Sequence, residues 1–123
     1  MFNELAVVTG GAGGLGRLIT RALPRQGLSV VLADTDRDAA ARVLEELRDH
    51  GHSGRFVETD ASHADAVRRL MAQVADLGTP KVLVNNAGGW LPGPQYPDSE
   101  QWRRSLDLNL AMPMLTASWL FHS

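Results

Sequence analysis

The chain has 123 residues, of which 44% are hydrophobic and 21% charged, with a formal net charge of −2 and no cysteine. This size and composition suit one globular domain with a buried core, and the lack of cysteine excludes disulfides and thiolate metal sites. Neither a basic excess nor an acidic tail points to nucleic acid or an anionic membrane as a partner. No leader-like segment or membrane-length apolar run is present, so we expect a cytoplasmic protein without a membrane segment.

The first half of the chain alternates between apolar runs and stretches of helical spacing. Residues 5–9 are apolar and rich in β-branched side chains, which predicts a buried strand. Apolar residues three and four apart predict a helix over 15–26, ended by Pro24 and Gly27. A second apolar strand is expected over 28–33, and a second helix over 37–50.

The second half continues this alternation. A third strand is predicted over 55–59, and Ser62 is the expected N-cap of the helix that follows. A fourth strand over 81–84 runs into the sequence NNAG at 85–88. After a loop rich in proline and glycine, a last helical region is expected from about residue 100 to the C-terminus, with a break near Pro113.

Strands that are apolar throughout and alternate with helices predict an α/β fold with a parallel sheet covered on both faces. Right-handed crossovers make this a doubly wound, Rossmann-like sheet. About four strands with their flanking helices are present, so the predicted sheet is incomplete.

Five glycines lie between positions 10 and 16, at the turn from the first strand to the first helix. Bare backbone before a helix N-terminus lets a phosphate approach free N–H groups, at the sheet edge where ligands of such folds bind. Asp34 closes the second strand 18 residues after Gly16, at a position where an acid accepts hydrogen bonds from an adenosine ribose. The sequence therefore predicts a bound dinucleotide, with a ligand-free glycine-rich turn as the alternative.

The charge of Asp34 also bears on which dinucleotide is bound. A carboxylate there would repel the 2′-phosphate of NADP, which predicts a preference for NAD. Arg17 and Arg37 are near in sequence and would act against this preference. A structural alternative makes Asp34 the N-cap of the helix that begins near Arg37, and this is compatible with ribose binding.

Four separated motifs together resemble the short-chain dehydrogenase/reductase family over nearly the whole chain. They are TGGAGGLG at 9–16, Asp34 after the second strand, Asp60 after the third and NNAG at 85–88. The resemblance implies an NAD(P)-binding Rossmann domain over residues 1–123. It also implies hydride transfer between a nicotinamide and a carbonyl or alcohol carbon.

The resemblance further implies functions for particular residues, grouped by the part of the cofactor that each would contact. These are Gly10, Gly14, Leu15 and Gly16 at the pyrophosphate turn, Asp34 at the adenine ribose, Asp60 and Ala61 at the adenine, and Asn86, Ala87 and Gly88 along the cofactor. Asn109 matches a helix asparagine that supports the family's proton relay and is the one catalytic candidate. The alternative interpretation is that Asn109 is a polar residue in the middle of a helix, hydrogen-bonded to the backbone or to water, with no part in catalysis.

The family's catalytic serine and its Tyr-x-x-x-Lys pair follow the asparagine helix, and neither is found in these 123 residues. The only tyrosine is Tyr96, and residue 100 is glutamate where the pair requires lysine. We therefore expect the N-terminal, cofactor-binding portion of such an enzyme, which binds NAD(H) but is inactive alone. An alcohol or carbonyl substrate would require the missing half, and a homo-oligomer is possible.

Two alternatives are a non-catalytic NAD-binding module and an inactive fragment. A third is a methyltransferase of similar topology, but NNAG and the glycine pattern argue against a methyltransferase. For these 123 residues we also expect the fourth strand to form an exposed apolar edge, and Trp119, Leu120 and Phe121 to lack their usual cover.

The histidines and the aromatic and proline residues after NNAG give little evidence about function. His50, His52 and His63 lack metal-ligand spacing, so capping or solvent exposure is expected and no metal site is predicted. Trp90, Pro92 and Tyr96 follow NNAG, where the family often places substrate-facing residues, but ordinary loop packing explains them equally well.

Overall fold

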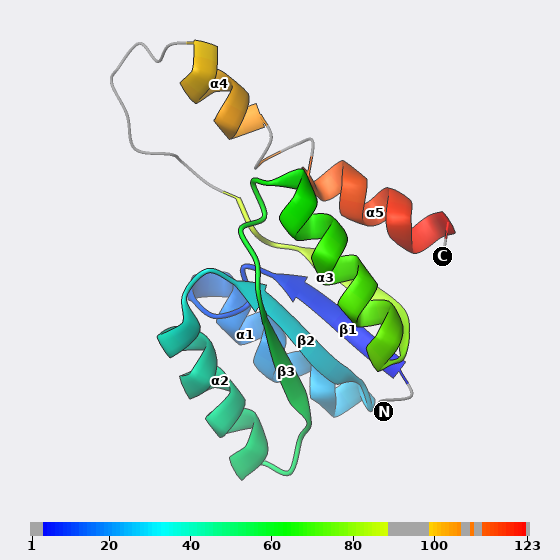
Figure 1. Cartoon of the computed structure of the whole chain (residues 1–123). Helices are drawn as coiled ribbons and strands as arrows, with labels where there is room; N and C mark the ends of the chain where they lie inside the picture. The colour runs from blue at the N-terminus through cyan, green and yellow to red at the C-terminus, as the bar shows by residue number, and fades with distance from the viewer. Residues whose placement is uncertain (1–3, 89–98, 107–108, 110–111, 123) are drawn as a thin grey trace.

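The computed structural model describes residues 4–88, 99–106, 109 and 112–122. Four strands and five helices, with one 3₁₀ turn, alternate along this part of the chain (Figure 1). They are β1 (Glu4–Thr9), α1 (Gly14–Ala22), the 3₁₀ turn η1 (Leu23–Gln26), β2 (Ser29–Asp34), α2 (Arg37–Asp49), β3 (Gly54–Glu58), α3 (Ala64–Leu77), β4 (Thr79–Asn85), α4 (Ser99–Leu106) and α5 (Met112–His122). Trp90, Pro92 and Tyr96 lie outside the described residues, as do the side chains of Trp119, Leu120 and Phe121.

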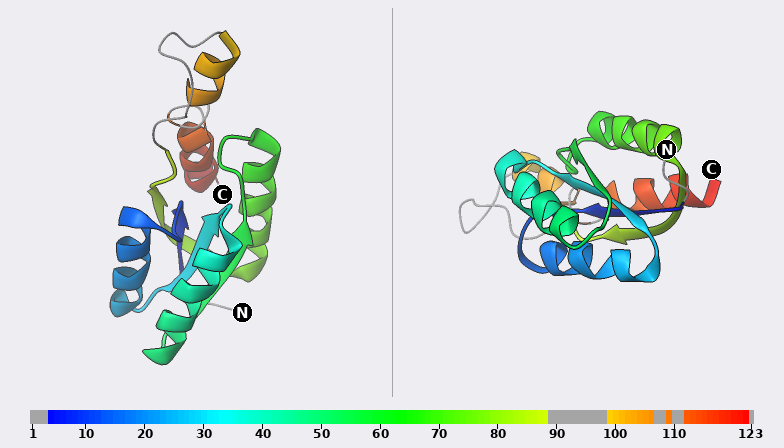
Figure 2. Two further views of the ribbon diagram at one scale, coloured as in Figure 1. Left: turned by 90° about the vertical axis from the view of Figure 1, so that its left-hand side faces the viewer. Right: turned by 90° about the horizontal axis from the view of Figure 1, so that it is seen from below.

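The four strands form one parallel sheet in the order β3-β2-β1-β4. Helices α1 and α2 cover one face, while α3 and α5 cover the other (Figure 2). The chain therefore runs from β1 outward to β3 on one side and returns across the sheet to β4 on the other. This is the predicted doubly wound Rossmann-like sheet, and its strand order reverses between β1 and β4.

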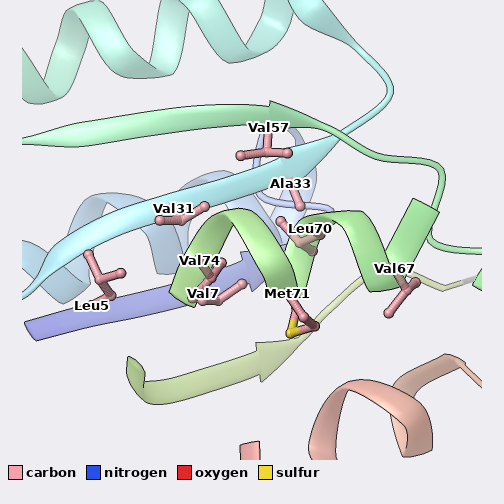
Figure 3. Packing of buried hydrophobic residues seen from close by; sticks show 9 residues of the cluster. All are labelled: Leu5, Val7, Val31, Ala33, Val57, Val67, Leu70, Met71 and Val74. Carbon is pink, nitrogen blue, oxygen red and sulfur yellow. The ribbon is translucent and has the colours of Figure 1, made fainter. Parts of the chain in front are cut away.

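The larger part of the core lies between the sheet and α3 (Figure 3). Alternate residues of β1 and β2, such as Leu5, Val7 and Val31, point to this face, where Leu70 and Val74 of α3 meet them. All five side chains are 2% exposed or less. The 3.6-residue period of α3 and the two-residue period of the strands thus bring their apolar positions to one interface.

Proline explains both boundaries that differ most from the sequence prediction. The first helix ends at Ala22 and continues as η1, because Pro24 has no N–H to donate to the preceding turn. The fourth strand begins two residues before the predicted 81, at Thr79, and includes Pro80. The register between β1 and β4 shifts at this point, so Pro80 occupies an irregular position in an edge strand.

The expectation that Ser62 caps the third helix is wrong. The N-cap is His63, whose side chain makes no capping bond. The Ser62 hydroxyl instead donates to Asp60 Oδ1 at 2.6 Å. A carboxylate two residues earlier outcompetes the helix for this hydroxyl, as is common where an Asx turn precedes a helix.

Helix α4 ends at Leu106 and α5 begins at Met112, with Pro113 in the first turn of α5, where a residue without an N–H is tolerated. The break expected near Pro113 stays a prediction, because residues 107, 108, 110 and 111 lie outside the described residues. Helix α5 is fixed to β4 by a small polar cluster beside its apolar contacts. Thr116 Oγ1, in a residue only 2% exposed, donates to Asn85 Oδ1 at 2.7 Å. Asn85 Nδ2 in turn donates to the Pro113 carbonyl oxygen at 3.2 Å.

Strand β4 lies at one edge of the described sheet, next to β1, as expected from the sequence. Its apolar side chains Val82, Leu83 and Val84 are half-buried, not exposed as expected. Within the described residues, every helix is too short or too polar to cross a lipid bilayer.

Replacing Thr116 tests how α5 is held. Thr116→Val keeps the side-chain shape but removes the hydroxyl, so we expect the free energy of unfolding to fall by about 1 kcal/mol. Ser118→Ala, at an exposed position of the same helix, should change it by less than about 0.5 kcal/mol. Urea unfolding followed by circular dichroism measures both, and equal values for the two variants would contradict the assignment.

Candidate functional site

The glycine turn lies at the carboxyl ends of β1 and β4, where the strand order reverses. Gly10 has a φ of +64°, which a residue with a Cβ rarely adopts. Its N–H donates to the Ala33 carbonyl oxygen of β2 at 2.7 Å. The chain therefore turns sharply at the end of β1 while staying bonded to the neighbouring strand.

Thr9 fixes NNAG to this turn. Its buried hydroxyl oxygen accepts the backbone N–H groups of Asn86 at 3.1 Å and Ala87 at 3.0 Å. Asn86 also donates from its side-chain Nδ2 to the Gly10 carbonyl oxygen at 2.9 Å. Two motifs more than seventy residues apart in sequence are thus one hydrogen-bonded unit.

Gly16 allows α1 to approach this unit closely. A Cβ built on Gly16 would lie 1.9 Å from the Gly10 carbonyl oxygen and 2.5 Å from Asn86 Nδ2. Both distances are far below van der Waals contact, and one neighbour is backbone. The last glycine of the motif therefore allows the close contact between α1 and the turn.

Gly13 and Gly14, in contrast to Gly16, have open space where a Cβ would lie. A Cβ on either residue would meet no atom within 4 Å, so this side of the turn is open. The first-turn N–H groups of α1 have no intrahelical acceptor, the N-cap Gly13 has no side chain to supply one, and no acidic residue stands in that turn. Open space before unpaired N–H groups and a helix N-terminus fits a pyrophosphate. Leu15 borders this space and is 65% exposed.

Asp34 lies where the sequence predicts, at the last position of β2. Its Oδ2 accepts the Ala12 N–H of the glycine turn at 3.1 Å, and its Oδ1 accepts the Asp36 N–H at 3.0 Å. The cap of α2 is Asp36, which accepts the Ala39 N–H, so the capping alternative for Asp34 is wrong. The carboxylate is oriented by two backbone groups and keeps lone pairs for hydroxyl donors.

Asp60 follows β3 at the same edge of the sheet. Partial burial acts to raise the pKa of its carboxyl group, but the hydrogen bonds from the Ser62 hydroxyl and N–H, and the charges of His63 and Arg104, outweigh burial. The net pKa is lowered, so the group is a carboxylate at neutral pH.

An open hollow of about 590 Å³ adjoins Asp60. The next residue, half-buried Ala61, lines a second, small hollow together with Thr9 and Ala87.

Asn109 is brought to the same region. A Cβ on Gly88 would lie 2.8 Å from Asn109 Oδ1, so the asparagine side chain lies directly against the end of NNAG. Its backbone is π-helical, between α4 and α5. Such local widening of a helix is frequent at functional positions.

The importance of Thr9 was missed in the sequence, where it served only to mark the start of the glycine motif. A polar residue that ends an apolar strand must find partners when buried, and that rule would have singled it out. The three histidines do not meet. His50 is the C-cap of α2 and His63 the N-cap of α3, and the described residues contain no group of three that could bind a metal.

Comparison with known proteins agrees with this arrangement. The family model for short chain dehydrogenases matches residues 4–122, which is almost the whole chain. The chain belongs to the short-chain dehydrogenase family. One relative, the cis-4-hydroxycyclohexanecarboxylate dehydrogenase of Sinomonas cyclohexanicum, is 39% identical over 113 residues, which cover 88% of this chain and 44% of that protein.

Two solved structures from metagenomic sources have the same fold. A short-chain oxidoreductase in complex with NADP superposes with a TM-score of 0.88 at 33% identity, covering 97% of this chain and 55% of the other. A blue fluorescent protein in complex with NADPH superposes with a TM-score of 0.88 at 29% identity, covering 98% of this chain and 51% of the other. The chain thus spans about half the length of the relatives it matches.

Substitution of Gly16 tests the contact between α1 and the turn. In Gly16→Ala the new methyl group overlaps the Gly10 carbonyl, so the turn must move and the free energy of unfolding should fall by about 1–3 kcal/mol or more. Gly13→Ala, which points into open space, should cost about 1 kcal/mol or less. Chemical denaturation of both variants measures the difference, and equal losses would rule out this account.

Proposed function

We propose that residues 1–123 form one NAD(H)-binding unit of an oxidoreductase that transfers hydride between the nicotinamide and a carbonyl or alcohol carbon. The observation that carries the proposal is the joining of Asp34 to the glycine turn through the Ala12 N–H. The proposed ribose acceptor and the proposed phosphate-binding turn would thereby be held at a fixed separation.

Each part of the cofactor then has a proposed binding region. The pyrophosphate would lie at the turn formed by Gly10, Gly14, Leu15 and Gly16, the adenine ribose at Asp34, and the adenine at Asp60 and Ala61. The segment Asn86–Gly88 would border the remainder. The open space at Gly13 and Gly14 and the hollow beside Asp60 support this arrangement.

The cofactor supplies the hydride when bound, and the protein binds, orients and moves protons. We assign Asn109 to a positioning role in proton transfer, on the basis of its contact with Gly88. The 123 residues contain no Tyr-x-x-x-Lys, the pair that exchanges the substrate proton in this family. We therefore propose that these residues alone bind cofactor without turnover, which keeps a non-catalytic NAD-binding module as the second candidate.

The expected cytoplasmic location, the alcohol or carbonyl substrate and a possible homo-oligomer stay predictions. The two solved relatives named above are complexes with NADP and NADPH, so the preference for NAD needs its own test.

Titration with NADH and, separately, NADPH tests the preference through the heat of binding. We expect NADH to bind at least about tenfold more tightly than NADPH, because Asp34 repels the 2′-phosphate of NADPH. Asp34→Asn should weaken NADH binding and reduce the preference, since the variant loses the charge and one acceptor. Asp36→Asn removes the same charge two residues away and remains a good N-cap, so it should preserve the preference. Tighter binding of NADPH by the unmodified chain would refute the assignment.

Turnover is tested with a panel of small alcohols and NAD, followed by NADH absorbance. We expect the chain to give the same rate as its Gly16→Ala variant, because neither supplies the proton-exchanging pair. A rate that falls in Gly16→Ala would belong to the chain itself and would disprove the proposed inactivity.

A further inference from the structure

Arg37, the first residue of α2, makes two contacts that turn it toward the outer strand β3. Its Nη2 donates to Glu58 Oε2 at 2.8 Å. Its guanidinium carbon lies 5.7 Å from the centroid of the Phe56 ring, within the range of a cation–π interaction. A salt bridge and an aromatic ring thus hold a cation that stands three residues after Asp34.

Glu58 also lies beside Asp34 in the sheet. The two are register partners on neighbouring parallel strands, as are Leu32 and Phe56 two residues earlier. Leu32 and Phe56 both pack into the cluster beneath α2. Because side chains alternate along a strand, Asp34 and Glu58 point to that same face. At the end of the sheet next to the proposed ribose position, the carboxylates of Asp34 and Glu58 therefore lie on neighbouring strands, with the Arg37 guanidinium bound to Glu58.

The other nearby arginine is also engaged. Arg17 Nη2 donates to Glu46 Oε1 at 2.5 Å, and Arg21 lies 3.2 Å from the second oxygen of the same carboxylate. Both arginines that could favour a 2′-phosphate, Arg17 and Arg37, are therefore paired with glutamates in this structure.

We propose that Glu58 is a specificity-determining residue that disfavours NADP(H) by holding Arg37 and by adding a second carboxylate beside Asp34. This rests on the proposed function, since it requires the adenine ribose to lie at Asp34. A 2′-phosphate carries a charge of about −2 at neutral pH. To gain Arg37 it must displace Glu58, and it then faces both carboxylates.

The ion pair between Arg37 and Glu58 contributes little to the stability of the fold. Its side chains are 69% and 55% exposed, and ion pairs at such positions contribute little to folding. For the same reason, a variant that lacks the Glu58 charge should keep its fold and leave Arg37 free to turn toward a phosphate.

Glu58→Gln tests the proposal through binding of NADH and NADPH at low salt. We expect NADPH to bind about tenfold more tightly than to the unmodified chain, the effect of one unit of charge near a protein surface. NADH binding should change by less than about twofold. The gain should shrink at high salt, because the interacting groups are exposed.

Two variants serve as controls. Glu45→Gln removes the same charge from an exposed position of α2 and should leave both affinities unchanged. The double variant Glu58→Gln/Arg37→Gln should lose most of the gain, because the released guanidinium is what binds the 2′-phosphate.

The outcomes separate this proposal from the one on which it rests. If the unmodified chain prefers NADH but Glu58→Gln binds NADPH no better than Glu45→Gln does, the specificity proposal is overturned and the proposed function stands. If the double variant keeps the increase in NADPH affinity, the proposal that Arg37 binds the 2′-phosphate is overturned. If the folded chain binds neither nucleotide, the proposed function fails and this inference with it.

Discussion

The contact between Gly16 and the Gly10 carbonyl oxygen is the constraint on which the site depends. It requires a residue without a Cβ at position 16, the point where α1 meets the turn after β1. At the same place the Asn86 side chain donates to the Gly10 carbonyl oxygen, and the Thr9 hydroxyl oxygen accepts the backbone N–H groups of Asn86 and Ala87. The strands β1 and β4, adjacent in space but far apart in sequence, are thereby aligned at their carboxyl ends.

Charge is distributed around this frame in a consistent way. The glycine turn presents backbone N–H groups and carries no acidic residue, whereas the ends of β2 and β3 carry Asp34, Glu58 and Asp60. A dinucleotide has its charge at the pyrophosphate and neutral hydroxyls on an NAD ribose. In the binding mode that we propose, donors would thus face the anionic pyrophosphate and acceptors would face the ribose hydroxyl groups.

Much of the fold could be predicted from the sequence, because β1 and β2 are apolar and buried and α1, α2 and α3 each have a regular apolar face. The doubly wound class of the sheet follows from those elements and the right-handed crossover rule, whereas the strand order β3-β2-β1-β4 came from the structure. The exact ends were harder: Pro24 and Pro80 altered elements in ways that depend on their neighbours, and Ser62 turned to Asp60 instead of capping α3. The pairing of Arg37 with Glu58 could not be predicted, since it joins residues 21 positions apart on different elements.

The irregular start of β4 has a consequence for how the edge of the sheet meets other chains. An edge strand with apolar side chains is a template for intermolecular pairing. Pro80 has no N–H to offer such a partner, and the register shift beside it places the charged Lys81 out of step with the regular ladder. A foreign strand could form an uninterrupted ladder only along Val82–Asn85, which is shorter than a typical strand. The proline that obscured the beginning of β4 in the sequence thus shortens the surface through which copies of the chain could aggregate.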